Sequence, residues 1–462
     1  MTMKKIRINY LMFLGVVVTI IGASCKKDWM DVKSDINQTV PSNLVDFEYL
    51  LDDYSTMSLQ TPGLAEVGSD GHYMLESRWS SLSVTSNTER NAYTWTNNLP
   101  NLAVGDWNES YKRIFQCNLV LDGLKKLSPN QETEKYNRIK GNALFHRAKN
   151  EYDLAQIYAQ PYQAVSAATD MGIPLKNGIN VTEPANRSTV KETYDRIITD
   201  LLTAKDLLPN LPEIKTRGSK AGVLALLART YLTIGDYGQA GFYADATLSL
   251  NNNLIDFNTI SATATNLGQF NVETIFFAAR INSWVSTWNS GSYGVDLLFY
   301  NLYDNNDLRK TRYFTFRGTD IIFKGNYYQG TIGFNGLAVD EQYLIRAECF
   351  ARLGNVTGAM KDLNDLLKTR WNNQVLYPIR TATNAEDALR QVLMERKKEL
   401  CFRNLRWTDL RRLNLDTRFK ETLTRTIGGN TYTLEPGSYK YTLPIPDDVM
   451  NLAPQMKQSP GW

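Results

Sequence analysis

The sequence predicts a mainly helical protein, a tetratricopeptide-like body of paired helices with long, partly irregular inserts that carry short strands. Three observations support this. Several segments place apolar residues at helical spacing, and one helix-pair pattern occurs twice. The chain has 462 residues, of which 43% are hydrophobic and 21% charged, enough for a large buried core. The chain is therefore neither disordered nor fibrous.

The first residues are typical of a signal peptide. Three basic residues precede a largely apolar run, 10–23, which is too short to span a hydrocarbon core of about 30 Å comfortably. The run ends in small residues directly before Cys25 and resembles the bacterial lipobox, although Gly22 stands where an aliphatic residue is usual. We expect residues 1–24 to be a lipoprotein signal peptide and Cys25 to be the lipidation site. Ordinary secretion and a retained anchor helix are the alternatives.

Four long helices are predicted outside the repeated pattern. Apolar periodicity predicts helices over 107–127 and 136–158. Thr189 and Glu192 have the spacing of a capping box, which marks the start of a third helix. A last long helix is expected over 385–401.

The repeated pattern is a small residue, an aromatic residue three positions on, a glycine at a turn, and two further small or apolar residues. Its two copies are Ala228, Tyr231, Gly235, Ala240, Ala244 and Ala347, Phe350, Gly354, Ala359, Leu363. This is the tetratricopeptide pattern, in which small residues let two helices approach closely. Since 119 positions separate the copies, long inserts must lie between them. Two unrelated helical hairpins are the alternative.

Two regions interrupt the helical pattern. Residues 55–99 are rich in Ser, Thr, Asn and Gly, and residues 251–336 are rich in Trp and Tyr. Both are expected to be long loops, which are usually functional inside a packed helical unit. Within the second, residues 274–278 are typical of a buried strand.

Charge and histidine content exclude several functions. Lys and Arg total 51 and Asp and Glu total 48, but three of the basic residues precede Cys25, so a chain starting there would carry 48 of each. This balance argues against a nucleic-acid binder. With only His72 and His146, a metal site would need carboxylates or cysteines to complete its ligands. No metal site or cofactor is predicted.

Cysteines and short motifs give no sign of catalysis. Cys117, Cys349 and Cys401 form no CxxC pair and are interpreted as small buried hydrophobes. No common hydrolase, nucleotide-binding or zinc-protease motif occurs. Residues 304–307, Asp-Asn-Asn-Asp, lack the glycine and distal glutamate of an EF-hand, so a capping turn is expected there.

Taken together, the motifs resemble the SusD/RagB family of outer-membrane lipoproteins from end to end. The resembling blocks are 25–32 with 50–52, Trp107 with Tyr111, Arg147 with Asp153, 273–277, 343–348, 395–400 with 406–412, and 443–446 with 459–462. Cys401 and Asn404-Leu405 depart from the family pattern, which affects packing. The acidic and basic residues of 395–412 could be mistaken for a catalytic cluster, but structural ion pairs explain them as well.

The resemblance implies a non-enzymatic, glycan-binding lipoprotein, acylated at Cys25 (palmitate) and facing the cell exterior from the outer membrane. It would sit like a lid over a TonB-dependent transporter of the SusC/RagA type, with ligand contacts made by loops. It also implies one SusD-like domain over 25–462, with an N-terminal part of about 25–210 and a RagB/SusD C-terminal part of about 211–462.

Aromatic residues of the two inserts are the candidate ligand contacts. A sugar ring needs a flat aromatic face for its CH groups and polar groups for its hydroxyls. The candidates are Trp79, Trp95 with Asn97, Trp284, Trp288 and Tyr293, with Tyr327 and Tyr328 in reserve. We expect them to line one shared surface. Packing within the loops is the alternative for each, and Trp107, Trp371 and Trp407 are expected in the core.

Three other functions remain open from the sequence. The ligand could be an oligopeptide, as in the RagB branch, where a groove would offer backbone-bonding groups more than stacked tryptophan. The protein could be a surface hydrolase, which the missing motifs disfavour. It could also stabilise its transporter and hold no ligand itself.

Overall fold

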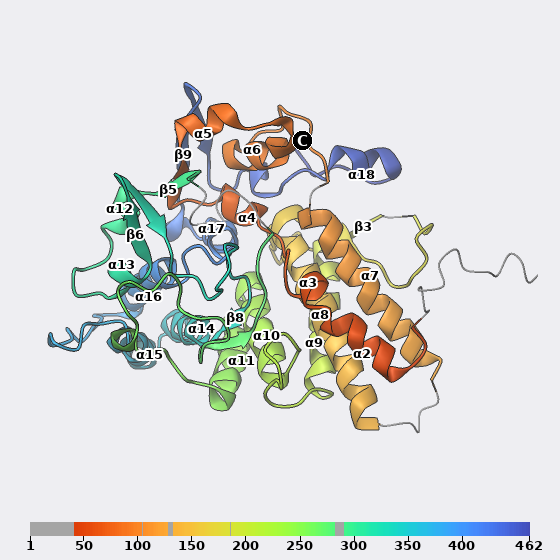
Figure 1. Ribbon diagram of the computed structural model, residues 1–462, viewed down its shortest axis with the longest axis horizontal. Helices are drawn as coiled ribbons and strands as arrows, with labels where there is room; N and C mark the ends of the chain where they lie inside the picture. The colour runs from red at the N-terminus through yellow and green to blue at the C-terminus, as the bar shows by residue number, and fades with distance from the viewer. Residues whose placement is uncertain (1–40, 104, 128–132, 185, 282–290) are drawn as a thin grey trace, which may run out of the picture. The chain divides into compact units, whose positions relative to one another are not determined.

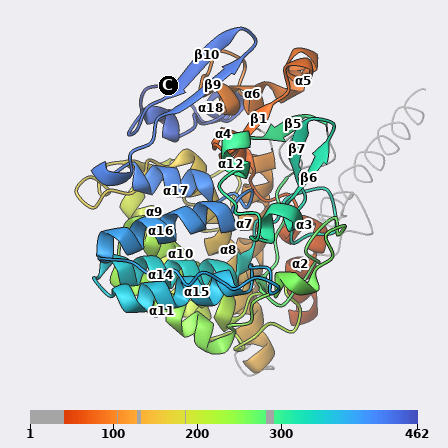
Figure 2. The ribbon, with the colours of Figure 1, turned by 90° about the vertical axis from the view of Figure 1, so that its left-hand side faces the viewer.

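The computed structural model describes residues 41–103, 105–127, 133–184, 186–281 and 291–462 (Figure 1). The chain divides into two units, Met1–Ser42 and Asn43–Trp462, and the second is described below. Its body is a succession of helices, each packed on the next (Figures 1 and 2). These are α7 (Gly105–Lys125), α8 (Thr133–Tyr158), α9 (Val190–Lys205), α10 (Lys220–Ile234), α11 (Tyr237–Leu250), α14 (Val339–Arg352), α15 (Val356–Lys368) and α16 (Ala385–Glu399).

The predicted helices are confirmed with shifts of a few residues at their ends. The capping box is present at the start of α9, where the Thr189 side chain accepts from the Glu192 N–H and the Glu192 carboxylate accepts from the Thr189 N–H. Helix α2 (Leu44–Asp52) packs on α7 and α8. No helix among the described residues is long and apolar enough to cross a membrane.

The two copies of the repeated pattern are confirmed as matching helix pairs. Gly235 and Gly354 end α10 and α14 at φ 83°, a conformation that favours glycine. The next residues, Asp236 and Asn355, cap α11 and α15 with their side chains. Small residues at the contacts are fully buried, namely Ala228, Ala240, Ala244, Ala347 and Ala359. Because α11 packs against α14, the two pairs are neighbours in space.

The expectation of a long loop over 55–99 is wrong, since this insert contains α3 (Tyr54–Met57), β1 (His72–Met74) and three further helices. These are α4 (Leu64–Gly68), α5 (Glu76–Ser81) and α6 (Asn87–Thr94). Helix α4 is buried and begins where the Asp106 carboxylate accepts from the N–H groups of Gly63 and Leu64, at 2.6 and 2.8 Å. A partner about forty positions away thus provides the cap, which local sequence does not reveal.

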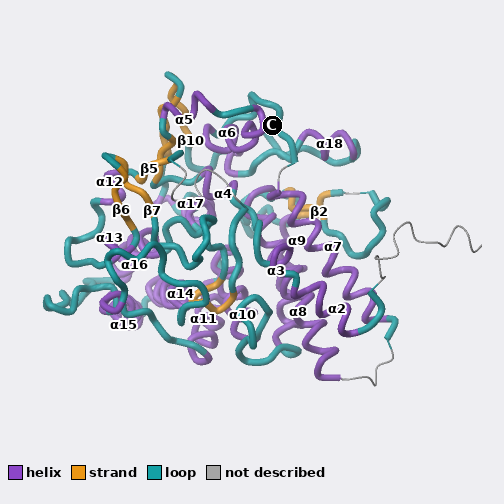
Figure 3. Tube along the Cα trace, viewed as in Figure 1, coloured by secondary structure: helices purple, strands orange, loops and turns teal. Residues whose placement is uncertain are grey.

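The second insert holds short strands at its ends and in its middle, as Figure 3 shows in orange. The predicted buried strand is confirmed as β4 (Thr274–Phe276), paired antiparallel with β8 (Leu337–Ala338). Between them lie β5 (Tyr293–Val295), α12 (Leu297–Tyr300), α13 (Arg309–Arg312) and the antiparallel hairpin of β6 (Phe314–Arg317) and β7 (Asp320–Phe323).

The remaining elements complete the unit. A β2–β3 pair (Met171–Pro174, Arg187–Thr189) precedes α9, and the C-terminal part adds α17 (Arg406–Leu413), the hairpin β9–β10 (Leu423–Ile427, Asn430–Leu434) and α18 (Asp447–Leu452). Cys117, Cys349 and Cys401 are free and buried, which confirms their interpretation. In the turn 304–307 the Asp304 carboxylate accepts from the Asn306 N–H, and no group of described residues could hold a metal ion.

The charged residues of 395–412 are ion-paired, which confirms their structural interpretation. Arg396 binds Asp409, and Arg412 binds Glu348, in both cases within 3 Å. The Arg411 guanidinium donates to backbone carbonyls of α8 and the residue after it, including Ala159 at 2.6 Å. Most of these contacts join segments far apart in sequence, so the block ties the C-terminal part to the helical body.

Glu151 on α8 is a buried carboxyl group. Neither of its oxygens has a hydrogen-bond partner within the described part of the chain. Burial raises its pKa from 4.5 to about 7, and the charge of Arg196 offsets only part of this shift. In the unfolded chain the group ionises near pH 4.5. The contribution of Glu151 to the free energy of unfolding is therefore fully present below that pH and is lost as the pH rises through about 7.

Replacing Glu151 with glutamine is expected to remove this pH dependence. The free energy of unfolding of Glu151→Gln minus that of wild type should be about 3 kcal/mol larger at pH 8 than at pH 4. Urea unfolding at both pH values measures the change. The exposed Glu386→Gln is the matched control, and a Glu151→Gln effect equal at both pH values would show that the pKa of Glu151 is the same in the folded and the unfolded chain.

Candidate functional site

A short sheet joins the two inserts that the sequence proposes as ligand-binding regions. Strand β1 pairs antiparallel with β5, with Tyr73 opposite Gly294. The pairing extends beyond the strands, since the Leu75 N–H donates to the Ser292 carbonyl and the Asp296 N–H donates to the Gly71 carbonyl. Segments more than 200 positions apart therefore form one surface, near α5 and the β6–β7 hairpin in Figure 2.

Tyr73 forms a flat aromatic platform on this sheet. Its ring crosses the strand at Gly294, where a Cβ atom would lie only 2.4 Å from the ring Cζ. Glycine is thus required under the ring, and 39% of the tyrosine remains exposed. The Tyr73 hydroxyl donates to the Asp320 carboxylate of β7 at 3.2 Å, which holds the ring in place. Partial burial and the charge of Asp320 raise the Tyr73 pKa, so the hydroxyl stays protonated at neutral pH.

Charged groups border the Tyr73 platform. Arg317 is the cross-strand partner of Asp320, and its guanidinium lies within 4 Å of the position that a Gly291 Cβ would occupy. Asp296, at the start of α12, is close enough to influence the Tyr73 hydroxyl. An apolar ring face beside carboxylate and guanidinium groups suits a sugar, whose CH face stacks while its hydroxyls donate and accept hydrogen bonds.

Two nominated aromatic residues are buried and cannot present a face to a ligand, which corrects the sequence expectation. Trp95 has no exposed surface; its indole N–H donates to the Gly68 carbonyl at 2.9 Å, and the Arg425 guanidinium lies 4.6 Å from its ring. Tyr293 is 1% exposed and packs on Phe402.

The other nominated residues have mixed placements. Trp79 is half-buried, with the Arg90 guanidinium 4.8 Å from its ring and Gly428 at its indole nitrogen. Asn97 is exposed. Trp284 and Trp288 lie outside the described residues. The reserve pair divides likewise, since Tyr327 is buried and bonded to Asp340 and Glu273, while Tyr328 is half-buried. The structure thus keeps Trp79 and Asn97 as accessible candidates.

The sequence reasoning missed Tyr73. Its signal was the alternation of His72, Tyr73 and Met74, in which the outer two are buried and the middle one is exposed. A three-residue strand is too short for that alternation to stand out. Its glycine partner and its carboxylate partner come from the other insert, so only the fold identifies the platform.

A larger cleft of about 750 Å³ lies between α7, α18 and the loop 176–184. Its walls are mostly apolar, and Trp107 at its base is 7% exposed, as expected for a core residue. Trp407 is also in the core, as expected. Its lining also includes Phe115, which is 38% exposed, together with the charged residues Lys176 and Glu183. The Tyr73 platform differs from this cleft in joining the two inserts that the sequence proposes as ligand-binding regions.

Comparisons with known proteins agree with the fold. Residues 28–232 match the SusD-like family model described as starch-binding and associating with the outer membrane, and residues 339–462 match the SusD family model. The chain is 24% identical over 425 residues to SusD-like protein P2 of Formosa agariphila, covering 77% of this chain and 80% of that protein.

Solved structures share the architecture. A SusD superfamily protein from Bacteroides vulgatus is 22% identical and superposes with a TM-score of 0.72 over 91% of this chain and 99% of that one. A laminarin-binding SusD-like protein is 16% identical, with a TM-score of 0.66 over 90% of this chain and 98% of that one. The two family models together cover the first insert, most of the helical body and the C-terminal part, and they show that the chain belongs to the SusD/RagB family.

Proposed function

We propose that this protein is a cell-surface lipoprotein that captures oligosaccharides and delivers them to a SusC-like TonB-dependent outer-membrane transporter, without breaking any bond. The observation that carries the proposal is the Tyr73 platform, an open aromatic face held by Asp320 and bordered by Arg317. The family description as starch-binding and the laminarin-binding relative support a glycan as the ligand class. Lipidation at Cys25 would hold the protein at the membrane.

Removing the Tyr73 ring is expected to weaken glycan binding. By analogy with aromatic base stacking, Tyr73→Ala should cost about 1–3 kcal/mol of binding free energy. Calorimetry with laminarin and starch oligosaccharides measures this on the chain from residue 26. Tyr49→Ala is the control, since Tyr49 lies exposed on α2, away from the platform.

Two results would count against the proposal. If Tyr73→Ala binds every ligand as wild type does, the platform is not the glycan site. If no polysaccharide binds but a peptide library does, the ligand is an oligopeptide. A wild-type melting temperature for Tyr73→Ala is expected, because half-exposed surface side chains contribute little to stability.

Lipidation gives a separate test of the cellular location. Replacing Cys25 with alanine should leave the protein unlabelled by a clickable fatty acid and release it from the membrane fraction, because the acyl chains are its only proposed anchor. Cys117→Ala is the control, since Cys117 is buried. Continued labelling of Cys25→Ala would show that another residue is acylated.

A further inference from the structure

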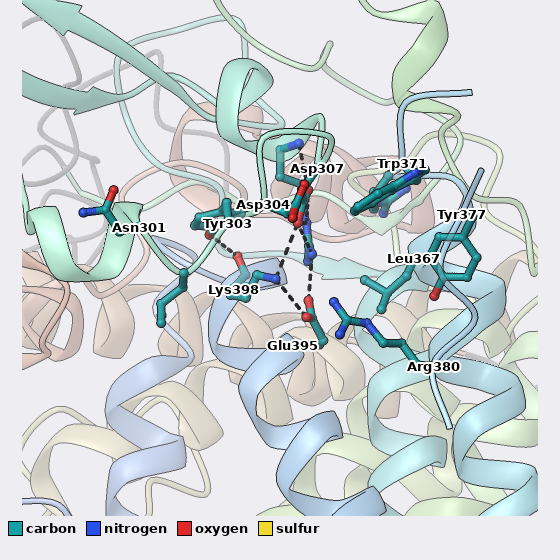
Figure 4. A pocket seen from close by; sticks show the side chains of 13 residues that line it. Asn301, Tyr303, Asp304, Asp307, Leu367, Trp371, Tyr377, Arg380, Glu395 and Lys398 are labelled. Carbon is teal, nitrogen blue, oxygen red and sulfur yellow. Dashed lines mark hydrogen bonds and ion pairs between the residues drawn. The ribbon is translucent and has the colours of Figure 1, made fainter. Parts of the chain in front are cut away.

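A second cavity has a volume of about 300 Å³. Its lining residues are far from β1 in the sequence and include none of the Tyr73 platform. Its walls come from the turn before α13, the end of α15 with the loop that follows, and α16. Figure 4 shows Trp371, Tyr377 and Arg380 on one side of a charged centre formed by Asp307, Glu395 and Lys398. Trp371, which the sequence places in the core, is only half-buried and lines this cavity.

The charged centre is built from buried, fully paired side chains. Arg309, which is 1% exposed, donates to Asp307 and Glu395 at 2.7 Å and to Glu399 at 2.9 Å. Lys398 is also buried and donates to Glu395 at 2.8 Å. These bonds fix the position of each group before any ligand arrives, which lowers the entropy cost of binding.

Most charged side chains around the cavity are paired with one another. Its lining contains the cations Arg309, Arg370, Arg380 and Lys398 and the carboxylates Asp304, Asp307 and Glu395. Outside the lining, Glu399 accepts from both Arg309 and Arg370, and Glu273 accepts from Arg370. An ionic ligand that entered the centre formed by Arg309, Lys398, Asp307 and Glu395 would have to separate one of these pairs at a desolvation cost, whereas Arg380 stands outside them. A neutral, polar ligand can bond to the paired groups without separating them.

Hydrogen-bonding groups of both kinds remain available to such a ligand. Arg380 is exposed, and within the described residues only its backbone is bonded, to Asn364. Its guanidinium therefore has donors to offer. Of the three N–H donors of Lys398, one bonds to Glu395 and one faces Asp307 at 3.4 Å, which leaves one. Asp307 and Glu395 provide acceptor oxygens. Trp371 and Tyr377, whose rings lie 6.0 Å apart and nearly perpendicular, form an apolar wall beside them.

We propose that this cavity is a second carbohydrate site, which takes a single neutral sugar ring, either a free monosaccharide or the end unit of a chain. Each sugar hydroxyl both donates and accepts, which matches the mixture of Arg380, Lys398, Asp307 and Glu395, and the CH face matches the Trp371 wall. About 300 Å³ is at the small end of ligand pockets, which favours one ring over an extended chain.

The test is a monosaccharide titration in which saturation-transfer NMR and calorimetry measure binding. The probes are glucose, galactose, mannose and N-acetylglucosamine, with glycine and alanine as zwitterionic comparisons. At least one sugar should bind to wild type, and Arg380→Ala should weaken it about tenfold or more, as expected for a lost hydrogen bond from a charged group. Arg380→Ala should melt as wild type does, because its side chain is exposed and has no ion-pair partner among the described residues.

Arg390→Ala is the matched control, an exposed arginine on α16 outside the cavity, and should change binding by no more than about twofold. Tyr73→Ala should leave monosaccharide binding intact, so failure here and failure of the Tyr73 platform give different results. The proposal is overturned if none of the four sugars binds, if Arg380→Ala binds as wild type does, or if only the amino acids bind.

Discussion

Replacing Trp95 with alanine is expected to destabilise the protein by about 3–5 kcal/mol, as for other large aromatic side chains removed from a core. The ring is fully buried, and its indole N–H satisfies the Gly68 carbonyl at the end of α4. The Arg425 guanidinium packs over the Trp95 ring. It also donates to backbone carbonyls of the first insert, including that of Val67 at 3.1 Å. The substitution thus leaves a cavity and a buried acceptor without its donor.

Urea unfolding of Trp95→Ala beside Tyr49→Ala measures the effect. Tyr49 is 71% exposed, so its variant should stay within about 0.5 kcal/mol of wild type. Should Trp95→Ala instead keep its stability and lose glycan binding, the ring contacts ligand, and its burial here would be the wrong description.

The Glu399→Gln variant should lose a similar amount, about 3–5 kcal/mol, because it removes a buried carboxylate that two buried arginines share and leaves each with only its other partners. Glu399 has no exposed surface and accepts from Arg309 at 2.9 Å and from Arg370 at 2.7 Å. Burial alone would raise its pKa, but the charges of Arg370 and Arg309 hold the pKa well below its usual range. The carboxylate is therefore ionised at neutral pH.

Its control is Glu386→Gln at the start of the same helix. Glu386 is exposed and pairs with Arg390, and it should contribute little to stability because solvent screens the pair. Unfolding by urea at pH 7 compares the two variants. Equal, small losses would mean that solvent reaches Arg309 and Arg370 and screens their charges.

The sequence predicted those parts of the fold that short-range contacts specify. The α9 capping box needs only Thr189 and Glu192, and each repeat turn needs only a glycine followed by a capping side chain, at Gly235 and Gly354. Such signals lie within a few positions of each other, so a single sequence contains them in full.

Long-range contacts explain the parts that the sequence did not predict. Helix α4 depends on Asp106, and the burial of Trp95 depends on Gly68 and Arg425. Composition alone makes 55–99 look like an exposed loop, because its polar residues are as frequent as in loops. The candidate ligand site also depends on long-range contacts. The sequence indicated that the two inserts carry the ligand surface, but Tyr73 stands out only when Gly294 and Asp320 are beside it.

The contact between α11 and α14 has a consequence for how this scaffold can change. The chain leaves the helical body after Leu250 and returns at Leu337, and the Tyr343 hydroxyl of α14 donates to the Asn252 carbonyl, so the exit and the return are adjacent. Doubling the length of a detour that closes on itself costs only about 0.6 kcal/mol of loop entropy. The segment between these points can therefore change in length at little entropic cost, provided that β5 keeps its pairing with β1 and Arg309 keeps its ion pairs with α16.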